Sequence, residues 1–547
     1  MSALTTIKAT SMKRLLPLVA AAAALLLTAG ARAAAPGITG PTFALTAQPA
    51  YITQPDGQAV YSWGYGCTTP TGHTFVPATL SATVPGNIPI TPFCNTMQVP
   101  GPTLVVTEGV QVSVTLTNAL PASAGNTSIL FPGFNVTATG GVAGLLTQEA
   151  APGSTVMYTF TPGSPGTRAY YSGTHGDLQV EMGLYGAIIV LPNGTAPSCP
   201  THNTAAGLNT TGTALQSGGE LDYRLSSAAY HVAQSCYDRE YLFQFSEMDP
   251  NIHKQALAQV TARAGCAAGA AGCSLNVPTE PYSPAYFMIN GRSMPDDMDT
   301  NYAAQYPHQP YNGNPHMHPG ELVLLRIIGQ GRWQHPFHEH GNHVRILARD
   351  GNLILSSSST PTAPQLAGPL LFTTTTTPGL AMDGIFYWTG KGLNWDAYGH
   401  HPGSSDALAT LPCTPDANGY NTGPTHLTDV NYYEWCQDHN KPLQAAPFGD
   451  VAGGGPATLP DANLFTNGAW YGGSPYLGPN ATIRATGPTG TTPPSGTIAN
   501  PPGSEAGFAF MWHSHNEREI TTNNIFPGGM LMMMLVDSRE FVIDESN

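Results

Sequence analysis

The chain has 547 residues, a formal net charge of -15 at pH 7 and only 10% charged residues, and 61 Gly and 50 Pro supply turn formers throughout. So many helix breakers exclude a helical bundle, and a hydrophobic content of 41% excludes a disordered chain. A strongly negative surface repels nucleic acid and anionic membranes, so we expect neither as a partner.

The first 33 residues have the features of a secretory signal peptide. Lys13 and Arg14 precede an apolar run at 15–28, and a small-x-small tripeptide follows at 31–33. No later stretch approaches the roughly 20 apolar residues of a transmembrane segment. We therefore expect an exported protein, in the periplasm, at the cell surface or outside the cell. Removing the segment takes the net charge from -15 to -19, because it holds four Lys or Arg and no acid.

Alternating apolar residues predict a first β domain over residues 38–195. One face of an expected strand carries Val110, Val112, Val114 and Leu116, and a second strand repeats the pattern with Val156, Tyr158 and Phe160. A buried closing strand is expected over 183–190. Residues 196–235 are rich in Thr, Ser, Gly and Asn, which predicts a linker.

A second β domain is predicted over residues 236–543. The apolar runs that indicate it lie at 322–328, 338–347 and 530–536, after a short helix expected at 252–262. The stretch from about 352 to 505 is crowded with Pro, Gly and Thr and is predicted to be a large loop-rich insertion. The expected fold class is therefore all-β, with tandem β-sandwich domains; a three-domain arrangement is the alternative.

The eight cysteines form an even set in a chain expected to be exported, which favours disulfides over metal thiolates. None shows CxxC spacing or adjoins a histidine cluster. We predict that each disulfide joins two cysteines that are neighbours in sequence order. The eight cysteines are Cys67, Cys94, Cys199, Cys236, Cys266, Cys273, Cys413 and Cys436.

Two pairs of histidines, His338 with His340 and His513 with His515, are the strongest functional signal; we call these four residues the histidine quartet. Alternate side chains of a strand share a face, so each pair projects to one side. Two such strands side by side would bring four imidazoles to one point. Imidazole suits copper, zinc, nickel and iron, and among divalent ions Cu(II) binds nitrogen most tightly. The sequence therefore predicts a metal site at the quartet.

Residues 335–341, HPFHEHG, and 512–515, WHSH, resemble the third and fourth copper motifs of the multicopper oxidases, the cupredoxin-fold family of the laccases. The resemblance covers roughly a third of the chain, including the segments 101–103, 183–186, 290–292 and 319–321. It implies tandem cupredoxin-like Greek-key domains, copper as the cofactor, and a small-molecule or metal-ion electron donor. Two-domain members resemble trimers, so an oligomer is possible.

Several positions depart from the family pattern. The first motif falls on 130–132 and the second on 170–173, so their histidines are missing, although His175 stands nearby. In the fourth motif Ser514 replaces the copper-binding cysteine and Glu519 the last histidine. A serine hydroxyl is a hard ligand that cannot replace the thiolate, so no blue copper is expected. Four remaining histidines are also too few for the family's three-copper cluster.

The sequence thus predicts a copper-dependent oxidoreductase with a single metal ion. The quartet binds the ion, and His175 or water completes its coordination shell. A noncatalytic copper-binding or scaffold protein is the alternative. His335, Glu339 and Ser514 lie on the other strand face, either as a second weak metal site or as a packed polar remnant. We favour the remnant, because histidines and carboxylates often pair structurally.

Overall fold

The computed structural model describes residues 35–67, 74–76, 83–84, 88–89, 94–194, 227–391, 414–422, 473–476 and 507–537, with the single residues 197, 199, 435, 437 and 543. The predicted signal peptide, most of the predicted linker and most of the stretch from 392 to 505 lie outside these residues. Within them, no helix is long and apolar enough to cross a membrane.

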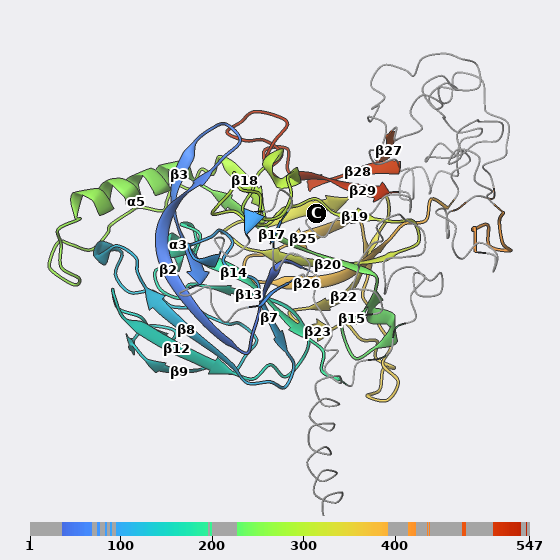
Figure 1. Ribbon diagram of the computed structural model, residues 1–547, viewed down its shortest axis with the longest axis horizontal. Coiled ribbons are helices and arrows are strands. Elements are labelled where there is room, and N and C mark those ends of the chain that lie inside the picture. The colour runs from blue at the N-terminus through green and yellow to red at the C-terminus, as the bar shows by residue number, and fades with distance from the viewer. Residues whose placement is uncertain are drawn as a thin grey trace, which may run out of the picture.

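The first part of the chain folds into two five-stranded sheets around a common core (Figure 1). One sheet has the order β13-β14-β7-β1-β4, with bounds Gly166–Tyr171, Tyr185–Leu191, Leu104–Thr107, Gly37–Thr39 and Thr74–Val76. The other has the order β3-β2-β8-β12-β9, with bounds Ala59–Cys67, Thr42–Thr53, Val112–Asn118, Thr155–Phe160 and Thr137–Gly140. Small elements connect them: β5 (Thr83–Val84), β6 (Ile88–Pro89), η2 (Ala122–Ala124), β10 (Val142–Ala143), β11 (Gln148–Glu149) and α3 (Gly176–Gln179).

The alternation read from the sequence corresponds to burial in this sandwich. Val112, Val114 and Leu116 on β8 are each 0% exposed. Their counterparts on β12, at positions 156, 158 and 160, are at most 2% exposed. Val110 is the exception with 41% exposure, because it lies in the turn before β8 begins.

The second part of the chain forms two larger sheets. One has the order β18-β17-β20-β26-β22-β23 with β24 beside β22, and bounds Tyr286–Ile289, Arg239–Met248, Leu322–Gly329, Ala381–Tyr387, Val344–Arg349, Asn352–Leu353 and Leu370–Leu371. The other has the order β19-β29-β28-β21-β25 with β27 beside β28, and bounds His316–Met317, Leu531–Asp537, Gly507–Ser514, His335–Glu339, Thr373–Thr376 and Gly473–Tyr476. Remaining elements are β15 (Ser227–Ala228), η3 (Ala233–Ser235), β16 (Cys236–Tyr237), α5 (Pro250–Ala262) and η4 (Asp296–Met298). The predicted all-β fold of tandem sandwiches is thereby confirmed.

Two predictions within the second sandwich are corrected. The single strand expected over 338–347 is two strands in different sheets, β21 and β22. Gly341 permits the break, because its φ is +98° and an added Cβ would lie 3.0 Å from the Phe510 ring. The start of the expected insertion is sheet rather than loop, because β26 pairs with both β20 and β22 at the centre of its sheet.

Helix α5 joins the two halves, because it follows β17 of the second sandwich but packs beside β3 of the first (Figure 1). Asp249 caps it by accepting a hydrogen bond from the Asn251 backbone N–H, and Pro250 occupies the first turn. Ile252 and Ala256 are buried in the core of the first sandwich. The expected helix is therefore confirmed.

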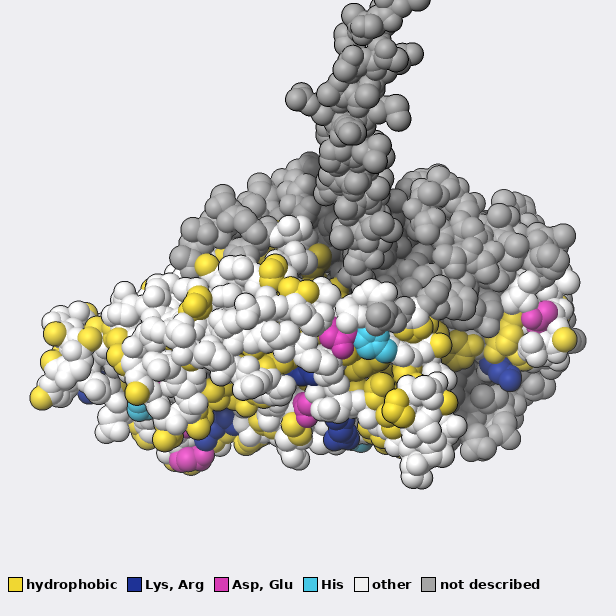
Figure 2. Space-filling view, turned by 90° about the horizontal axis from the view of Figure 1, so that it is seen from below, with side chains coloured by type: hydrophobic (Ala, Val, Ile, Leu, Met, Phe, Trp, Pro, Cys, Tyr) yellow, Lys and Arg dark blue, Asp and Glu magenta, His cyan; other side chains and the backbone are white. Residues whose placement is uncertain are grey.

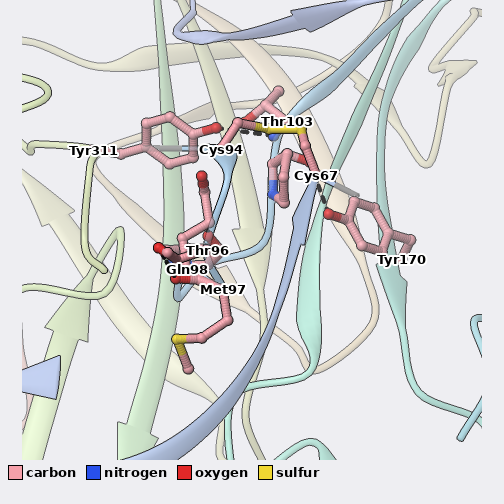
Figure 3. Close-up of a disulfide and its surroundings, with 10 residues drawn as sticks. Cys67, Cys94, Thr96, Met97, Gln98, Thr103, Tyr170 and Tyr311 are labelled. Atoms are coloured by element: carbon pink, nitrogen blue, oxygen red, sulfur yellow. Dashed lines mark hydrogen bonds between the residues drawn. A yellow bond between two sulfur atoms is a disulfide. The ribbon is translucent and has the colours of Figure 1, made fainter. Parts of the chain in front are cut away.

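Three disulfides join Cys67 to Cys94, Cys199 to Cys236, and Cys266 to Cys273. The predicted pairing of sequence neighbours is confirmed for these, whereas Cys413 and Cys436 lie outside the described residues. Figure 3 shows the first disulfide between Tyr170 of β13 and Tyr311. The Tyr311 hydroxyl accepts a hydrogen bond from the Thr103 N–H at 3.0 Å, so this region also holds the two halves together.

A buried polar cluster around Asp383 of β26 links the sandwiches directly. Asp383 Oδ1 accepts a 2.6 Å hydrogen bond from the Thr167 hydroxyl, and Oδ2 accepts from the Thr167 N–H and the Tyr230 hydroxyl. Arg326 lies 3.6 Å away and also donates to Glu240 at 2.8 Å. Every charge in the cluster therefore has a partner from another strand.

Charged side chains are sparse on the surface. Figure 2 shows them scattered singly over one face, among hydrophobic and uncharged side chains. The two ion pairs of Arg326 described above are buried instead, with side-chain exposures of at most 1%.

Replacing Asp383 by Ala should therefore lower the free energy of unfolding by about 3–5 kcal/mol, because it removes the buried acceptor of the Tyr230 and Thr167 hydroxyls and one of the two carboxylates that neutralise Arg326. Denaturant unfolding measures the change. Asp177→Ala is the control, since its one hydrogen bond, to Thr279, is exposed and should cost at most about 1 kcal/mol. Equal effects of the two substitutions would show that the Asp383 cluster does not hold the sandwiches together.

Candidate metal centre

The antiparallel pairing of β21 with β28 brings the histidine quartet together. His338 lies directly opposite His513, and directly opposed residues of paired strands point to the same side of a sheet. The remaining two members follow the ends of these strands, and their rings contact those of the first two. Ring centroids within the quartet lie 4.7 Å (His338–His340), 5.0 Å (His338–His515) and 5.1 Å (His340–His513) apart.

Hydrogen bonds orient two of the four rings. His513 Nδ1 lies 2.7 Å from the Ser514 carbonyl oxygen, which can only accept, so Nδ1 carries the proton and Nε2 of the neutral ring carries the lone pair. His338 Nδ1 lies 2.6 Å from the Thr373 hydroxyl of β25. Metal-binding imidazoles are commonly oriented in this way through the nitrogen that does not bind the ion.

The nitrogens are close enough to share an ion. His340 Nε2 lies 3.2 Å from His513 Nε2, and two ligands of a tetrahedral ion with bonds of about 2.0 Å would lie about 3.3 Å apart. Burial, and then the charges of the neighbouring imidazoles, lower the pKa of His338 to about 4; burial also lowers the pKa of His513. Both rings are therefore neutral at pH 7, which is the form that binds metals.

The four rings do not yet surround one point as a closed coordination sphere. Within the described residues, no group of three or more His, Cys, Asp or Glu has a geometry ready to hold a metal ion. The donor set and the 3.2 Å nitrogen pair thus fit an ion such as copper, but side-chain rotation is needed to complete the sphere.

Both ring nitrogens of His335, at the start of β21, face carboxylates. Nε2 lies 2.8 Å from Glu247 Oε2 and Nδ1 lies 2.9 Å from Glu519 Oε2. Burial alone would lower the pKa of His335, but hydrogen bonds and charges of the two carboxylates outweigh it and raise the pKa to about 9. The Ser514 hydroxyl also donates to Glu519. His335 is therefore a buried imidazolium with no nitrogen left for a metal.

Glu247 of β17 anchors this imidazolium from the other sheet. Its Oε1 accepts hydrogen bonds from the backbone N–H groups of Arg332 and Trp333, at 2.6 and 2.9 Å, and from the Tyr282 hydroxyl at 3.2 Å. The sequence analysis did not single out Glu247. Its strand also contains Arg239, Glu240, Gln244 and Ser246, so no pattern in the sequence distinguished Glu247.

Glu339 does not join the His335 cluster. Its Oε1 accepts a 2.6 Å hydrogen bond from the Thr374 hydroxyl, and burial raises its pKa to about 8. The carboxyl is therefore largely protonated at pH 7. It packs in the sheet as a neutral group, which agrees with a polar remnant better than with a second metal site.

His175 lies apart from the quartet. It is exposed, precedes α3 with φ of 44°, and within the described part of the chain its ring makes no hydrogen bond or ring contact with the quartet. It lines a cavity of about 680 Å³ together with Leu130 and Tyr171. These two residues belong to the segments aligned with the family's first two copper motifs, and they still form an antiparallel β-bridge.

Comparison with known proteins finds the same family. The sequence model of the multicopper oxidase family matches residues 90–195. A curated relative from Cercospora beticola, named "Multicopper oxidase CTB12", is 34% identical over 110 residues, which cover 20% of this chain and 16% of that protein. The matched segment is thus about a sixth of the relative's length.

Several solved structures are similar at low identity. A blue copper oxidase from Nitrosomonas europaea has 14% identity, covering 90% of this chain and 85% of that chain, with a TM-score of 0.41. A copper nitrite reductase from Nitrosomonas europaea has 18% identity over 64% and 85% of the two chains, with a TM-score of 0.37. A laccase from Botrytis aclada has 18% identity over 64% and 47%, with a TM-score of 0.35.

The family match at 90–195 covers the region that holds the first two motif positions. The similarity to the multicopper oxidases is therefore shown for residues 90–195, and it agrees with the family resemblance noted in the sequence.

Proposed function

We propose that this chain is an exported copper protein in which the histidine quartet holds one copper ion and supports oxidation of a small organic or metal-ion electron donor. The observation that carries the proposal is the cluster of four imidazoles at the β21–β28 pairing. A copper ion bound there would supply one-electron exchange. The chain itself binds and orients the ion and controls access to it.

The residues around the quartet fit these tasks. The Thr373 hydroxyl and the Ser514 carbonyl fix two rings, which lowers the cost of ordering ligands when the ion binds. His338 is 1% exposed, whereas His515 is exposed, so a donor would approach from the His515 side. The net charge of -15 favours cationic donors over anionic ones.

The position of the blue copper in the family is filled by protein groups in this chain. Ser514 and Glu519 stand where the family pattern has two copper ligands. The Ser514 hydroxyl donates to Glu519, and Glu519 pairs with His335. No thiolate is present there. We therefore propose a centre at the quartet alone, without a blue copper.

A noncatalytic copper-binding protein is the second candidate. It is favoured by the quartet's incomplete coordination sphere within the described residues. Rings that must rotate to bind an ion suit slow capture of that ion. The two candidates differ in turnover. Copper-loaded protein that oxidises no donor, organic or metallic, would support storage or binding instead of catalysis.

Copper titration should reach close to one tightly bound ion per chain. Replacing both His338 and His513 by Ala removes one ligand from each strand and should abolish most of this binding, measured by calorimetry and elemental analysis. His343→Ala is the matched control, because His343 lies on the same segment but packs against Phe372 outside the quartet. Unchanged copper content in the double variant would refute the quartet as the site.

Copper-loaded protein should lack an intense thiolate-to-copper absorption band, because Ser514 supplies no thiolate. Ser514→Cys alone should not create the band, since His335 Nδ1 remains paired with Glu519. Optical spectra of the two proteins test both statements. A strong blue colour in the unmodified protein would contradict the assignment of this position.

Stability should depend on pH through His335. Its pKa is about 9 in the folded chain and about 6.5 when unfolded, so its contribution is full below pH 6.5 and is lost as the pH rises through 9. The difference corresponds to about 3 kcal/mol. Denaturant midpoints between pH 6 and 10 should fall more for the wild type than for His335→Gln. If the midpoints of the two proteins fall equally with pH, or if the His335 ring titrates near pH 6.5 by NMR, the two carboxylates do not stabilise the imidazolium.

A further inference from the structure

A second site, separate from the quartet, is formed by the cavity of about 680 Å³ that His175 borders. Its walls come from both sandwiches. Leu130, Tyr171 and Val180 belong to the first, and the segments 330–331 and 378–379 to the second. The volume lies within the range of about 300–1,000 Å³ that is typical of small-molecule sites.

The mouth of the cavity carries two exposed leucines. Leu145 is 92% exposed and Leu146 is 64% exposed, and both lie in the turn between β10 and β11, where the Gly144 N–H donates to the Thr147 carbonyl. Such turns favour Gly, Asn and Asp. Two large apolar side chains at this tip are exposed to water and do not pack in the core. A ligand that covers them would be stabilised, because it removes apolar surface from water.

The second-domain side of the cavity is rigid. The Gly379 N–H donates to the Gly329 carbonyl at 2.8 Å, which ties the two lining segments to each other. The Gln330 side chain donates to the Gly186 carbonyl at 2.9 Å and to Gln244 at 3.1 Å. The walls are thus formed before any ligand binds, which limits the entropy lost on binding.

One wall carries a carboxylate whose charge is not paired. Glu149 is 9% exposed, accepts a hydrogen bond from the Thr174 hydroxyl at 2.8 Å, and accepts another from the Asn126 amide at 3.0 Å. Across the described residues, no Lys, Arg or His forms an ion pair with it. A carboxylate has about four acceptor positions, so capacity remains for donors from a ligand.

From this combination we infer that the cavity binds an organic ammonium ion with an apolar body. The leucines and Val180 contact the body, and the ammonium donates to Glu149, whose buried charge it neutralises. The net charge of -15 also attracts cations to the protein. This inference is independent of the copper proposed for the quartet.

Calorimetric titration with 2-phenylethylammonium chloride tests the inference. The neutral isostere 2-phenylethanol should bind at least about tenfold more weakly, because it lacks the charge-assisted hydrogen bond, and phenylacetate should not bind measurably. Absence of ammonium binding, or equal binding of the three probes, would overturn the inference.

Variants locate the site. Glu149→Gln keeps the shape and should weaken only the ammonium, by about tenfold or more, and abolish its advantage over the alcohol. Leu146→Ser should weaken both the ammonium and the alcohol, and it should fold normally because Leu146 is largely exposed. Met157→Ser, on an exposed face of β12 outside the cavity, is the control and should change neither. Ammonium binding that survives Glu149→Gln unchanged, or survives Leu146→Ser unchanged, would place the ligand elsewhere.

Discussion

The antiparallel pairing of β21 with β28 is the constraint on which both the histidine quartet and the His335 cluster depend. It joins His340 to His513 across 173 residues of sequence. A slip of one residue would turn His513 toward the core and its neighbour Trp512 toward the quartet, because side chains alternate across a strand. Trp512 and Phe337 pack on the core side with ring centroids 6.1 Å apart. The hydrophobic core therefore fixes the register that assembles the imidazoles.

The same register governs the buried charges behind the quartet. The Ser514 hydroxyl donates to Glu519 five residues further along the same segment, and the strand pairing brings Glu519 to His335. A lone imidazolium in this apolar setting would be costly, whereas two flanking carboxylates stabilise it and hydrogen bonds satisfy Glu247. Hydrogen bonds and ion pairs between protein groups thus hold this part of the sheet together.

Local sequence patterns were sufficient to predict the strands β8, β12 and β20 and the helix α5, because each depends on residues close in sequence. The order of the cysteines along the chain predicted the three disulfides. Partners distant in sequence were not predictable. Glu247 meets His335 across 88 residues, and Thr373 meets His338 from a Thr-rich run without apolar alternation. That run, β25, and the following β26 were read as part of an insertion, although pairing with β20 and β22 makes β26 central. The four histidines could be read from the sequence as a motif, but the residues that orient them could not.

The two regions aligned with the family's copper motifs differ in side-chain chemistry. In the second sandwich the imidazoles remain, and the surrounding hydroxyl and carbonyl groups still orient them. In the first, Leu130 and Tyr171 stand at the aligned segments, and their β-bridge persists although no imidazole lies on it. An apolar side chain cannot bind an ion, but it can line a space for an organic molecule. In the alignment with the family pattern, the segments that lack the expected histidines are therefore the ones that supply Leu130 and Tyr171 to the wall of the cavity.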